Sequence, residues 1–239
     1  MGQMNLKQKK IIGGNFVPLY GSNSTGVSVD DFLLDIHPIT NQQYLHFVKK
    51  NPKWRRSQVL NLFADENYLY NWESDTVLGL EVSPNSAVTS VSWYAAKKYC
   101  DCQDSRLPTM DEWEYVAMAS ETNPNAQRDS LFNLMIIESY ELPKTYKNEI
   151  GSTYKNYWGI FDMHGLVWEW TSDFNSVLIS GESRQDVDVE RNLFCGSASI
   201  NATNLMDYAA FMRFAFRGSV KANYSIRTLG FRCSKDINQ

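Results

Sequence analysis

The chain has 239 residues, of which 43% are hydrophobic, 13% aromatic and 21% charged, and its formal net charge at pH 7 is −4. This composition excludes an intrinsically disordered chain, a collagen and a coiled coil, and the length suits one large domain or two small ones. The acidic balance argues against general nucleic-acid binding, and only 3 His and 4 Cys restrict the available metal and acid–base chemistry.

The start of the chain lacks a recognisable export signal. Residues 1–14 are basic but contain no apolar segment of the kind found in signal peptides. No apolar stretch approaches the roughly 20 residues that a membrane-spanning helix requires. We therefore expect no membrane span, and the sequence alone leaves open an intracellular protein or an exported one whose signal has been removed.

The first predicted elements are strands followed by a helix. Residues 16–21 and 27–38 alternate between apolar and polar side chains, as β-strands do. A helix is predicted over 41–50, because Thr40 can cap its first turn and apolar residues such as Phe47 recur at helical spacing.

Two further helices have clear start signals. Ser92 opens the second helix, in which Tyr99 and Cys100 lie on one apolar stripe, so Cys100 is expected to point inward. Thr109 and Glu112 form a capping box that opens the third helix. We expect all three helices to lie on the surface of a shared core.

Long segments without sustained periodicity separate these elements, at 53–90 and 120–157, and a polar stretch follows at 174–192. A last short strand is predicted at 229–234. Loops of this length in a compact domain must be held by metals, disulfides or aromatic side chains. The 7 Trp, 13 Tyr and 12 Phe can anchor such loops through aromatic packing. No repeat or linker marks a domain boundary.

Four sequence blocks are more specific than any periodicity: DFLLDIHPITNQQYLHFV (31–48), VTSVSWYAAKKYC to SRLPTMDEWEYVA (88–117), NYWGIFDMHGLVWEWTSD (156–173) and RFAFRGS to TLGFRC (213–233). In order and spacing they resemble the formylglycine-generating enzyme superfamily, the sulfatase-modifying factors. The resemblance implies one domain over 12–235 after an N-terminal extension at 1–11. It also implies an α+β fold of the C-type lectin-like kind, with few helices, short strands and long loops.

The third block carries a calcium prediction. In the family this loop holds calcium through a side-chain oxygen, two backbone carbonyls and a carboxylate, which correspond here to Asp162, Gly165, Val167 and Glu169. Calcium prefers hard oxygen ligands in an irregular loop, which agrees with two carboxylates around a glycine. The alternative is that the tryptophans of this block are core residues and that Asp162 only caps a turn.

The fourth block decides what the resemblance implies about catalysis. The formylglycine-generating enzymes of the family use two cysteines in this block to bind Cu(I) and the substrate cysteine. This chain has no cysteine between Cys195 and Cys233, and the alignment places Asn204 and Ala209 at the two positions. Neither side chain replaces a soft thiolate ligand. We therefore predict no catalytic residues and no formylglycine formation by this route.

The resemblance also implies one disulfide, because vertebrate-type members of the family join the positions of Cys100 and Cys233. Such a bridge favours an exported protein, periplasmic or extracellular, although a cytoplasmic location stays open. Cys102 and Cys195 are left over. They could pair with each other, stay free, or form a soft metal site with methionines.

The resemblance supports two main hypotheses for function. The chain looks most like cysteine-less members found beside copper nitrite reductases and other exported enzymes. This likeness implies a calcium-stabilised binding or maturation accessory protein with a peptide or protein partner. The alternative is an oxidoreductase with a relocated copper or iron site, and a third hypothesis is a lectin-like ligand-binding protein.

The accessory hypothesis places the recognition cleft in the last block. Aromatic and arginine side chains gather there, and these residue types dominate binding hot spots. The residues expected to line the cleft are Cys195, Ser197, Asn204, Tyr208, Phe211, Arg213 and Arg217. Neither nucleic acid nor a membrane is an expected partner.

Overall fold

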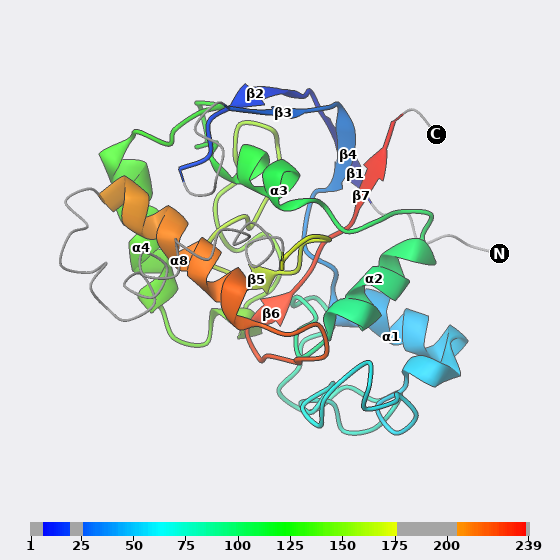
Figure 1. Cartoon of the computed structure of the whole chain (residues 1–239). Coiled ribbons are helices and arrows are strands. Elements are labelled where there is room, and N and C mark those ends of the chain that lie inside the picture. Colours follow the sequence, from blue (N-terminus) through cyan, green and yellow to red (C-terminus); the bar gives the residue numbers. More distant parts are fainter. Residues whose placement is uncertain (1–6, 20–25, 176–204, 238–239) are drawn as a thin grey trace, which may run out of the picture.

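The computed structural model describes residues 7–19, 26–175 and 205–237. Within these ranges short strands and helices alternate with long loops, which confirms the expected α+β class (Figure 1). In chain order the elements are β1 (Gln8–Ile11), β2 (Gly14–Phe16), β3 (Val27–Val29), β4 (Phe32–Asp35), α1 (Asn41–Lys50), η1 (Pro52–Trp54), α2 (Trp93–Asp101), α3 (Met110–Ala117), α4 (Ser130–Glu141), η2 (Thr145–Lys147), β5 (Trp168–Glu169), α8 (Leu205–Ser219), β6 (Leu229–Gly230) and β7 (Ser234–Asp236).

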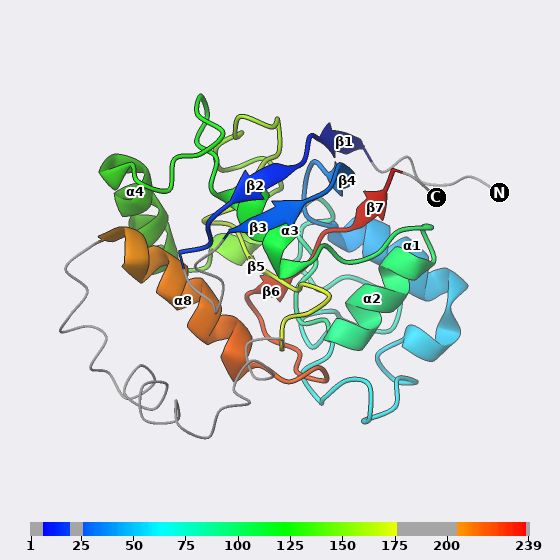
Figure 2. The same ribbon diagram turned by 45° about the horizontal axis from the view of Figure 1, so that its top comes forward.

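The three-stranded sheet joins the two ends of the described chain. Its strand order is β1-β4-β7, and both neighbouring pairs are antiparallel. The first and last strands therefore flank the same central strand (Figure 2). Gln8 of β1 pairs with Asp35 of β4, so residues 8–11, which the sequence analysis places in the N-terminal extension, form an edge strand of this sheet.

The strands expected near the start are shorter than the sequence pattern suggests. The strand predicted over 16–21 is misplaced: β2 shares only Phe16 with it, and no strand follows at 17–19, where Pro18 has no N–H for strand pairing. The segment predicted as one strand at 27–38 is divided into β3 and β4. At the division, Asp31 accepts a hydrogen bond from the Gly13 backbone N–H at 2.8 Å.

The three helices predicted from the sequence are confirmed, together with their caps. The Thr40 hydroxyl accepts a hydrogen bond from the Gln43 N–H at the start of α1, and the Gln43 side chain completes a capping box. Thr109 and Glu112 form the same arrangement at the start of α3, and Ser92 caps α2. Local side-chain chemistry therefore sets these three helix starts.

Two helices are not among those predicted, α4 in the region 120–157 and α8 in the last block. The Asp129 carboxylate caps α4 by accepting hydrogen bonds from the first N–H groups of the helix. Apolar residues occur on more than one side of α4, including exposed Leu131, so no single stripe marks it as a helix. The two helices lie side by side at one end of the molecule (Figures 1 and 2).

Aromatic side chains build much of the core. Tyr44 of α1 stacks on Tyr99 of α2 with 5.7 Å between ring centroids, and Phe231 meets both rings edge-on. Cys100 and Cys233 form a disulfide beside this cluster, and both residues are fully buried. The expected bridge is therefore confirmed, and it ties α2 to the segment that leads into β7.

Asp35 is a buried acid next to this disulfide. Its Oδ2 accepts a hydrogen bond from the Cys233 backbone N–H at 2.8 Å, but burial has the larger effect and raises the pKa of Asp35 to about 7. A folded-state pKa above the unfolded value of 3.8 means that this group stabilises the fold most below that value. The contribution is lost as the pH rises through about 7.

We therefore predict that Asp35→Asn increases the free energy of unfolding at pH 8 by about 2–4 kcal/mol, because each pKa unit corresponds to about 1.4 kcal/mol. The increase should shrink to near zero at about pH 4. Urea unfolding at both pH values measures the difference, with exposed Asp30→Asn as the matched control. An effect of Asp35→Asn that does not change with pH would contradict the prediction.

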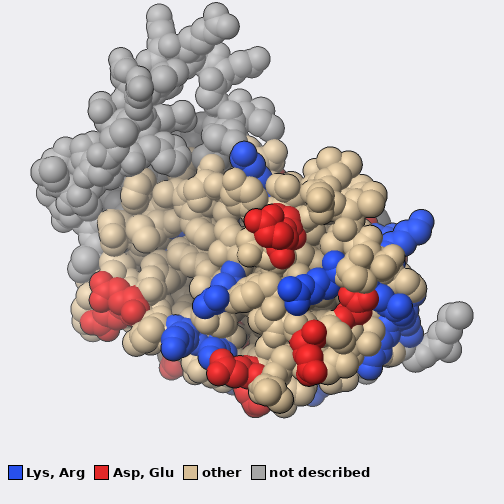
Figure 3. Space-filling model, turned by 90° about the horizontal axis from the view of Figure 1, so that it is seen from below, with Lys and Arg blue, Asp and Glu red and all other residues tan. Residues whose placement is uncertain are grey.

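The described residues contain no membrane-spanning helix, and the face drawn in Figure 3 carries charges of both signs. No helix in the described ranges is both long and apolar enough to cross a bilayer. On the side seen from below relative to Figure 1, Lys and Arg side chains are interspersed with Asp and Glu (Figure 3). The described part of that side therefore carries no continuous patch of one charge.

Candidate functional site

Helix α8 carries the expected cleft residues that the structure describes. Ala209, one of the two positions where the family's catalytic cysteines are expected, is fully buried. It packs in an apolar cluster with Phe132 and Ile136 of α4. Helix α4 therefore covers this position, and a side chain here meets hydrocarbon rather than a substrate.

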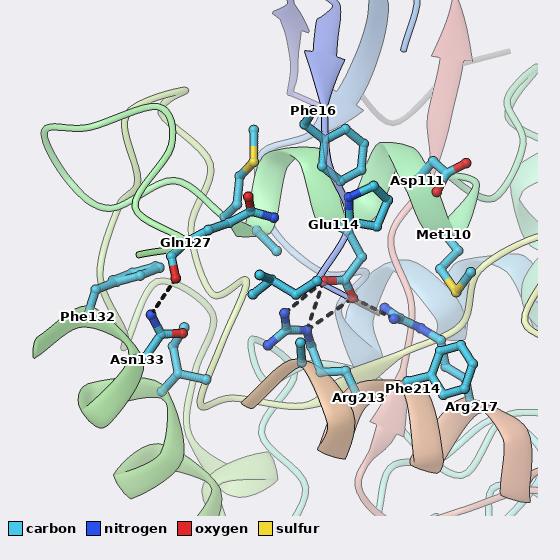
Figure 4. A pocket seen from close by; sticks show the side chains of 16 residues that line it. Phe16, Met110, Asp111, Glu114, Gln127, Phe132, Asn133, Arg213, Phe214 and Arg217 are labelled. Atoms are coloured by element: carbon cyan, nitrogen blue, oxygen red, sulfur yellow. Dashed lines mark hydrogen bonds and ion pairs between the residues drawn. The ribbon is translucent and has the colours of Figure 1, made fainter. Parts of the chain in front are cut away.

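One turn beyond Ala209 along the same face of α8, two arginines meet one glutamate of α3. Arg213 donates hydrogen bonds to both carboxylate oxygens of Glu114 at 2.8 to 3.0 Å, and Arg217 donates to Oε1 at 2.6 Å. The Arg217 guanidinium carbon also lies 4.7 Å from the centroid of the Trp113 ring. Figure 4 shows both arginines reaching from α8 towards Glu114.

These three charged side chains form part of the wall of a small cavity between β2, α3, α4 and α8 (Figure 4). The rest of the lining is mainly apolar and includes Phe16, Met118, Phe132, Ile136 and Phe214. Apolar walls with a few fixed polar groups are the kind of lining found in binding sites.

Two buried titratable groups near Arg213, Glu114 beside this cavity and His164 in a neighbouring one, keep one charge state near neutral pH. Burial acts to raise the pKa of Glu114, but the charges of Arg213 and Arg217 outweigh it and lower the pKa to about 2. Burial, followed by the charge of Arg213, lowers the pKa of His164 to about 3, so the imidazole is neutral. Its Nε2 lies 2.9 Å from the Ala117 carbonyl oxygen and therefore carries the proton. Neither Glu114 nor His164 exchanges protons near pH 7.

The loop with the predicted calcium ligands turns at Asp162 and Gly165, whose φ values are 61° and 84°. Asp162 is fully buried and accepts hydrogen bonds from the backbone N–H groups of Gly151 at 2.5 Å and Thr153 at 3.0 Å. The Thr153 hydroxyl donates a third hydrogen bond, to Asp162 Oδ1. Nδ1 of His37 lies 3.5 Å from Asp162 Oδ2. Burial acts to raise the pKa of Asp162, but these donors hold it below its usual value.

Glu169, the other predicted carboxylate ligand, is bound by an arginine from the end of the chain. Arg232 donates from Nη2 to Oε1 at 2.7 Å and from Nε to Oε2 at 2.8 Å, and Trp113 donates to Oε2 at 2.8 Å. Both charged side chains have no exposed surface. Arg232 also donates to the backbone carbonyls of Asp35 and Phe161, so its guanidinium joins three segments of the fold.

Comparison with known protein families matches residues 3–237 to the FGE-sulfatase family, described as the sulfatase-modifying factor enzyme 1-like domain. The chain belongs to this family. The match covers nearly the whole chain, so the resemblance inferred from the four sequence blocks is confirmed.

Individual relatives of this FGE-sulfatase domain differ in size and in name. The inactive C-alpha-formylglycine-generating enzyme 2 of Bos taurus is 24% identical over 87% of this chain and 78% of its own length. The serine/threonine-protein kinase Pkn1 of Chlamydia trachomatis is 25% identical over 88% of this chain, which spans only 34% of that protein. The structure of PvdO from Pseudomonas aeruginosa is similar with a TM-score of 0.53, covering 96% of this chain and 94% of that one at 14% identity, which is evidence of the fold alone.

The family assignment makes the state of the expected cleft residues informative. The sequence analysis expects Arg213 and Arg217 to lie open to a partner. In the structure they line the cavity, but both are buried and paired with Glu114. Tyr208 and Phe211 are partly buried on α8. The remaining expected cleft residues, Cys195, Ser197 and Asn204, lie outside the described residues.

The FGE-sulfatase family implies calcium in the 162–169 loop, and the side chains there do not fit such a site. The oxygens of Asp162 and Glu169 already accept hydrogen bonds from protein N–H and hydroxyl groups. The Arg232 guanidinium places a positive charge against Glu169, whereas calcium requires six to eight oxygen ligands around it. Burial of both carboxylates leaves little room for the waters that commonly complete its shell.

We therefore predict that calcium does not stabilise the domain. Thermal unfolding with calcium and with a chelator should give the same midpoint. If calcium bound a structural site and were present at one hundred times its Kd, it would add about 2.7 kcal/mol to the free energy of unfolding. The unfolding midpoint would then rise by several degrees. Magnesium provides the matched control for ionic effects, and a shift specific to calcium would contradict the prediction.

Sequence reasoning missed Glu114 and Arg232 as organising residues. The block around Glu114 reads as a capped scaffold helix, and Arg232 reads as part of a short terminal strand. One signal was available: Arg213 and Arg217 are four residues apart and so share one face of a helix, where two buried cations require an acidic partner. The identity of that partner depends on the tertiary fold.

Proposed function

We propose that this FGE-sulfatase domain is a non-oxidising binding or maturation accessory protein that recognises a peptide segment of a partner protein. The observation that carries the proposal is the environment of Ala209. This expected cysteine position is an alanine buried against α4, and an alanine offers no thiolate to copper or to a substrate. The domain thus keeps the scaffold of the family without the thiol pair.

Two further observations support a binding role. The cavity beside Glu114 combines apolar walls with fixed charges, a combination suited to recognition. A bovine relative that aligns over 87% of this chain is named an inactive formylglycine-generating enzyme, so loss of activity within this scaffold has a precedent.

The location and the scaffold type belong to the same proposal. A buried disulfide is typical of proteins that fold in an oxidising compartment, which supports export to the periplasm or the extracellular space. The partner is expected to be an exported enzyme, and the C-type lectin-like character of the scaffold stays an expectation. Calcium stabilisation is left out of the proposal because the 162–169 loop does not fit the ion.

Metal analysis of the purified protein tests the proposal against its main alternative, an oxidoreductase with a relocated metal site. The protein is expressed with copper and iron supplied, and the metal content per chain is measured by mass spectrometry. We expect neither metal at a significant fraction of one equivalent. Stoichiometric copper or iron would overturn the binding role in favour of redox chemistry. A Cys195→Ala variant would then show whether that thiol holds the metal.

A further inference from the structure

Two further cavities lie beside η2, β5 and the neighbouring loops. One has about 650 Å³ of open space and the other about 1120 Å³. Lys144 lines both, and the chain crosses from one to the other between Thr145 and Tyr146 and again between Arg227 and Thr228. The two cavities are therefore neighbours along one surface groove.

The smaller cavity is lined by a column of stacked rings. Tyr140 of α4 stacks on Trp168 of β5 with 4.8 Å between centroids, and Trp168 stacks on Phe216 of α8 at 4.5 Å. All three side chains are only partly buried. Exposed aromatic surface that is held rigid in this way favours an apolar or aromatic ligand side chain, because little conformational freedom is lost on binding.

The larger cavity is edged by cations. Lys147 forms an ion pair with Glu81, whose carboxylate also lies within electrostatic range of Lys144. No ion pair of Lys144 or Arg227 is formed among the described residues. The Arg227 guanidinium carbon lies 5.1 Å from the centroid of the Tyr70 ring, which holds it in place. Among the described residues that line this end of the groove, three cations therefore face the one carboxylate of Glu81, which leaves an excess of positive charge.

The backbone at Lys144 supports a role for its side chain. Its φ of 59° lies in the left-handed region, which costs a lysine on the order of 1 kcal/mol and which glycine adopts freely. A residue with a long cationic side chain stands at a position that suits glycine. Strain of this kind is concentrated at functional sites, where the side chain is needed in that place.

From this arrangement we infer that the groove binds an acidic peptide segment, whose carboxylates pair with Lys144 and Arg227 and whose aromatic or apolar side chain enters the ring-lined cavity. The inference rests on the proposed binding role and specifies the chemistry of the partner. The two cations set the charge of the ligand, and the aromatic column beside them sets the position of its apolar residue.

Fluorescence anisotropy with a labelled acidic peptide, Gly-Asp-Glu-Phe-Asp-Glu-Gly, tests the inference on the full chain. The same peptide with Asn and Gln in place of the acids should bind at least about tenfold more weakly. Lys144→Gly with Arg227→Gln should weaken binding of the acidic peptide by roughly tenfold, since each exposed ion pair accounts for up to about fivefold. Glycine suits the backbone at residue 144, so this variant should fold normally.

The matched control is Lys49→Gln with Lys50→Gln, which removes two exposed charges from α1 and should leave the affinity unchanged. Equal binding of the amide peptide, equal weakening by the control variant, or no binding of the acidic peptide would each overturn the inference. The metal analysis is independent of this assay. If the protein holds no metal and does not bind the acidic peptide, the inference about the groove is wrong, but the proposed binding role is not contradicted.

Discussion

Replacing Glu169 with Gln should lower the free energy of unfolding by about 3–5 kcal/mol, the usual cost of removing one partner of a buried ion pair. The side chains of Glu169 and Arg232 have no exposed surface, so water cannot solvate the guanidinium once the carboxylate is gone. Gln keeps the shape of Glu and can still accept a hydrogen bond from Trp113. The loss therefore reports the missing charge rather than a cavity.

Urea unfolding of Glu169→Gln and the parent chain measures this loss, with exposed Glu66→Gln as the matched control. The control should change the unfolding free energy by less than about 0.5 kcal/mol. A double variant, Glu169→Gln with Arg232→Met, should recover part of the loss because it also removes the unpaired cation. A loss below about 1 kcal/mol for Glu169→Gln would contradict the assigned role of this pair.

Removing the disulfide should have an effect of similar size. Cys100 and Cys233 are 133 positions apart, and closing a loop of this length is worth about 4–5 kcal/mol in the chain-entropy model. We predict that Cys100→Ala with Cys233→Ala lowers the free energy of unfolding by about this amount. Cys102→Ala should change little, because that cysteine is free and exposed.

Denaturant unfolding of the three proteins measures the effect, and a thiol count under denaturing conditions without reductant checks the bridge itself. Four free thiols in the parent chain would show that the bridge is absent in solution. That result would also remove the argument for export. Equal stability of the parent chain and the double variant would contradict the assigned contribution.

The parts of the fold that the sequence predicts are those set by neighbouring residues. Capping boxes at Thr40 and Thr109 fix helix starts through contacts three residues apart, and these starts are where the structure has them. Helix α4 escapes prediction because apolar residues such as Leu131 face solvent while others face α8. A pattern of one apolar face does not describe such a helix.

The candidate site was predictable only in its composition. Arg213 and Arg217 are visible in the sequence as a basic pair, but their partner Glu114 lies 99 and 103 positions away. Likewise, the sequence predicts Glu169 as a calcium ligand, whereas in the fold it pairs with Arg232, which lies 63 positions away in the chain. Charged residues show the chemistry available to a site, and the fold decides which of them neutralise one another.

The central claim is that this FGE-sulfatase domain binds without oxidising, and the most direct test is incubation with a cysteine-containing sulfatase-type peptide, Cu(I) and oxygen, followed by mass spectrometry. We predict that the peptide cysteine stays unconverted, because Ala209 stands buried where a catalytic thiol is expected. An active formylglycine-generating enzyme in the same buffer provides the positive control. Conversion of the cysteine to formylglycine by this chain would contradict the account.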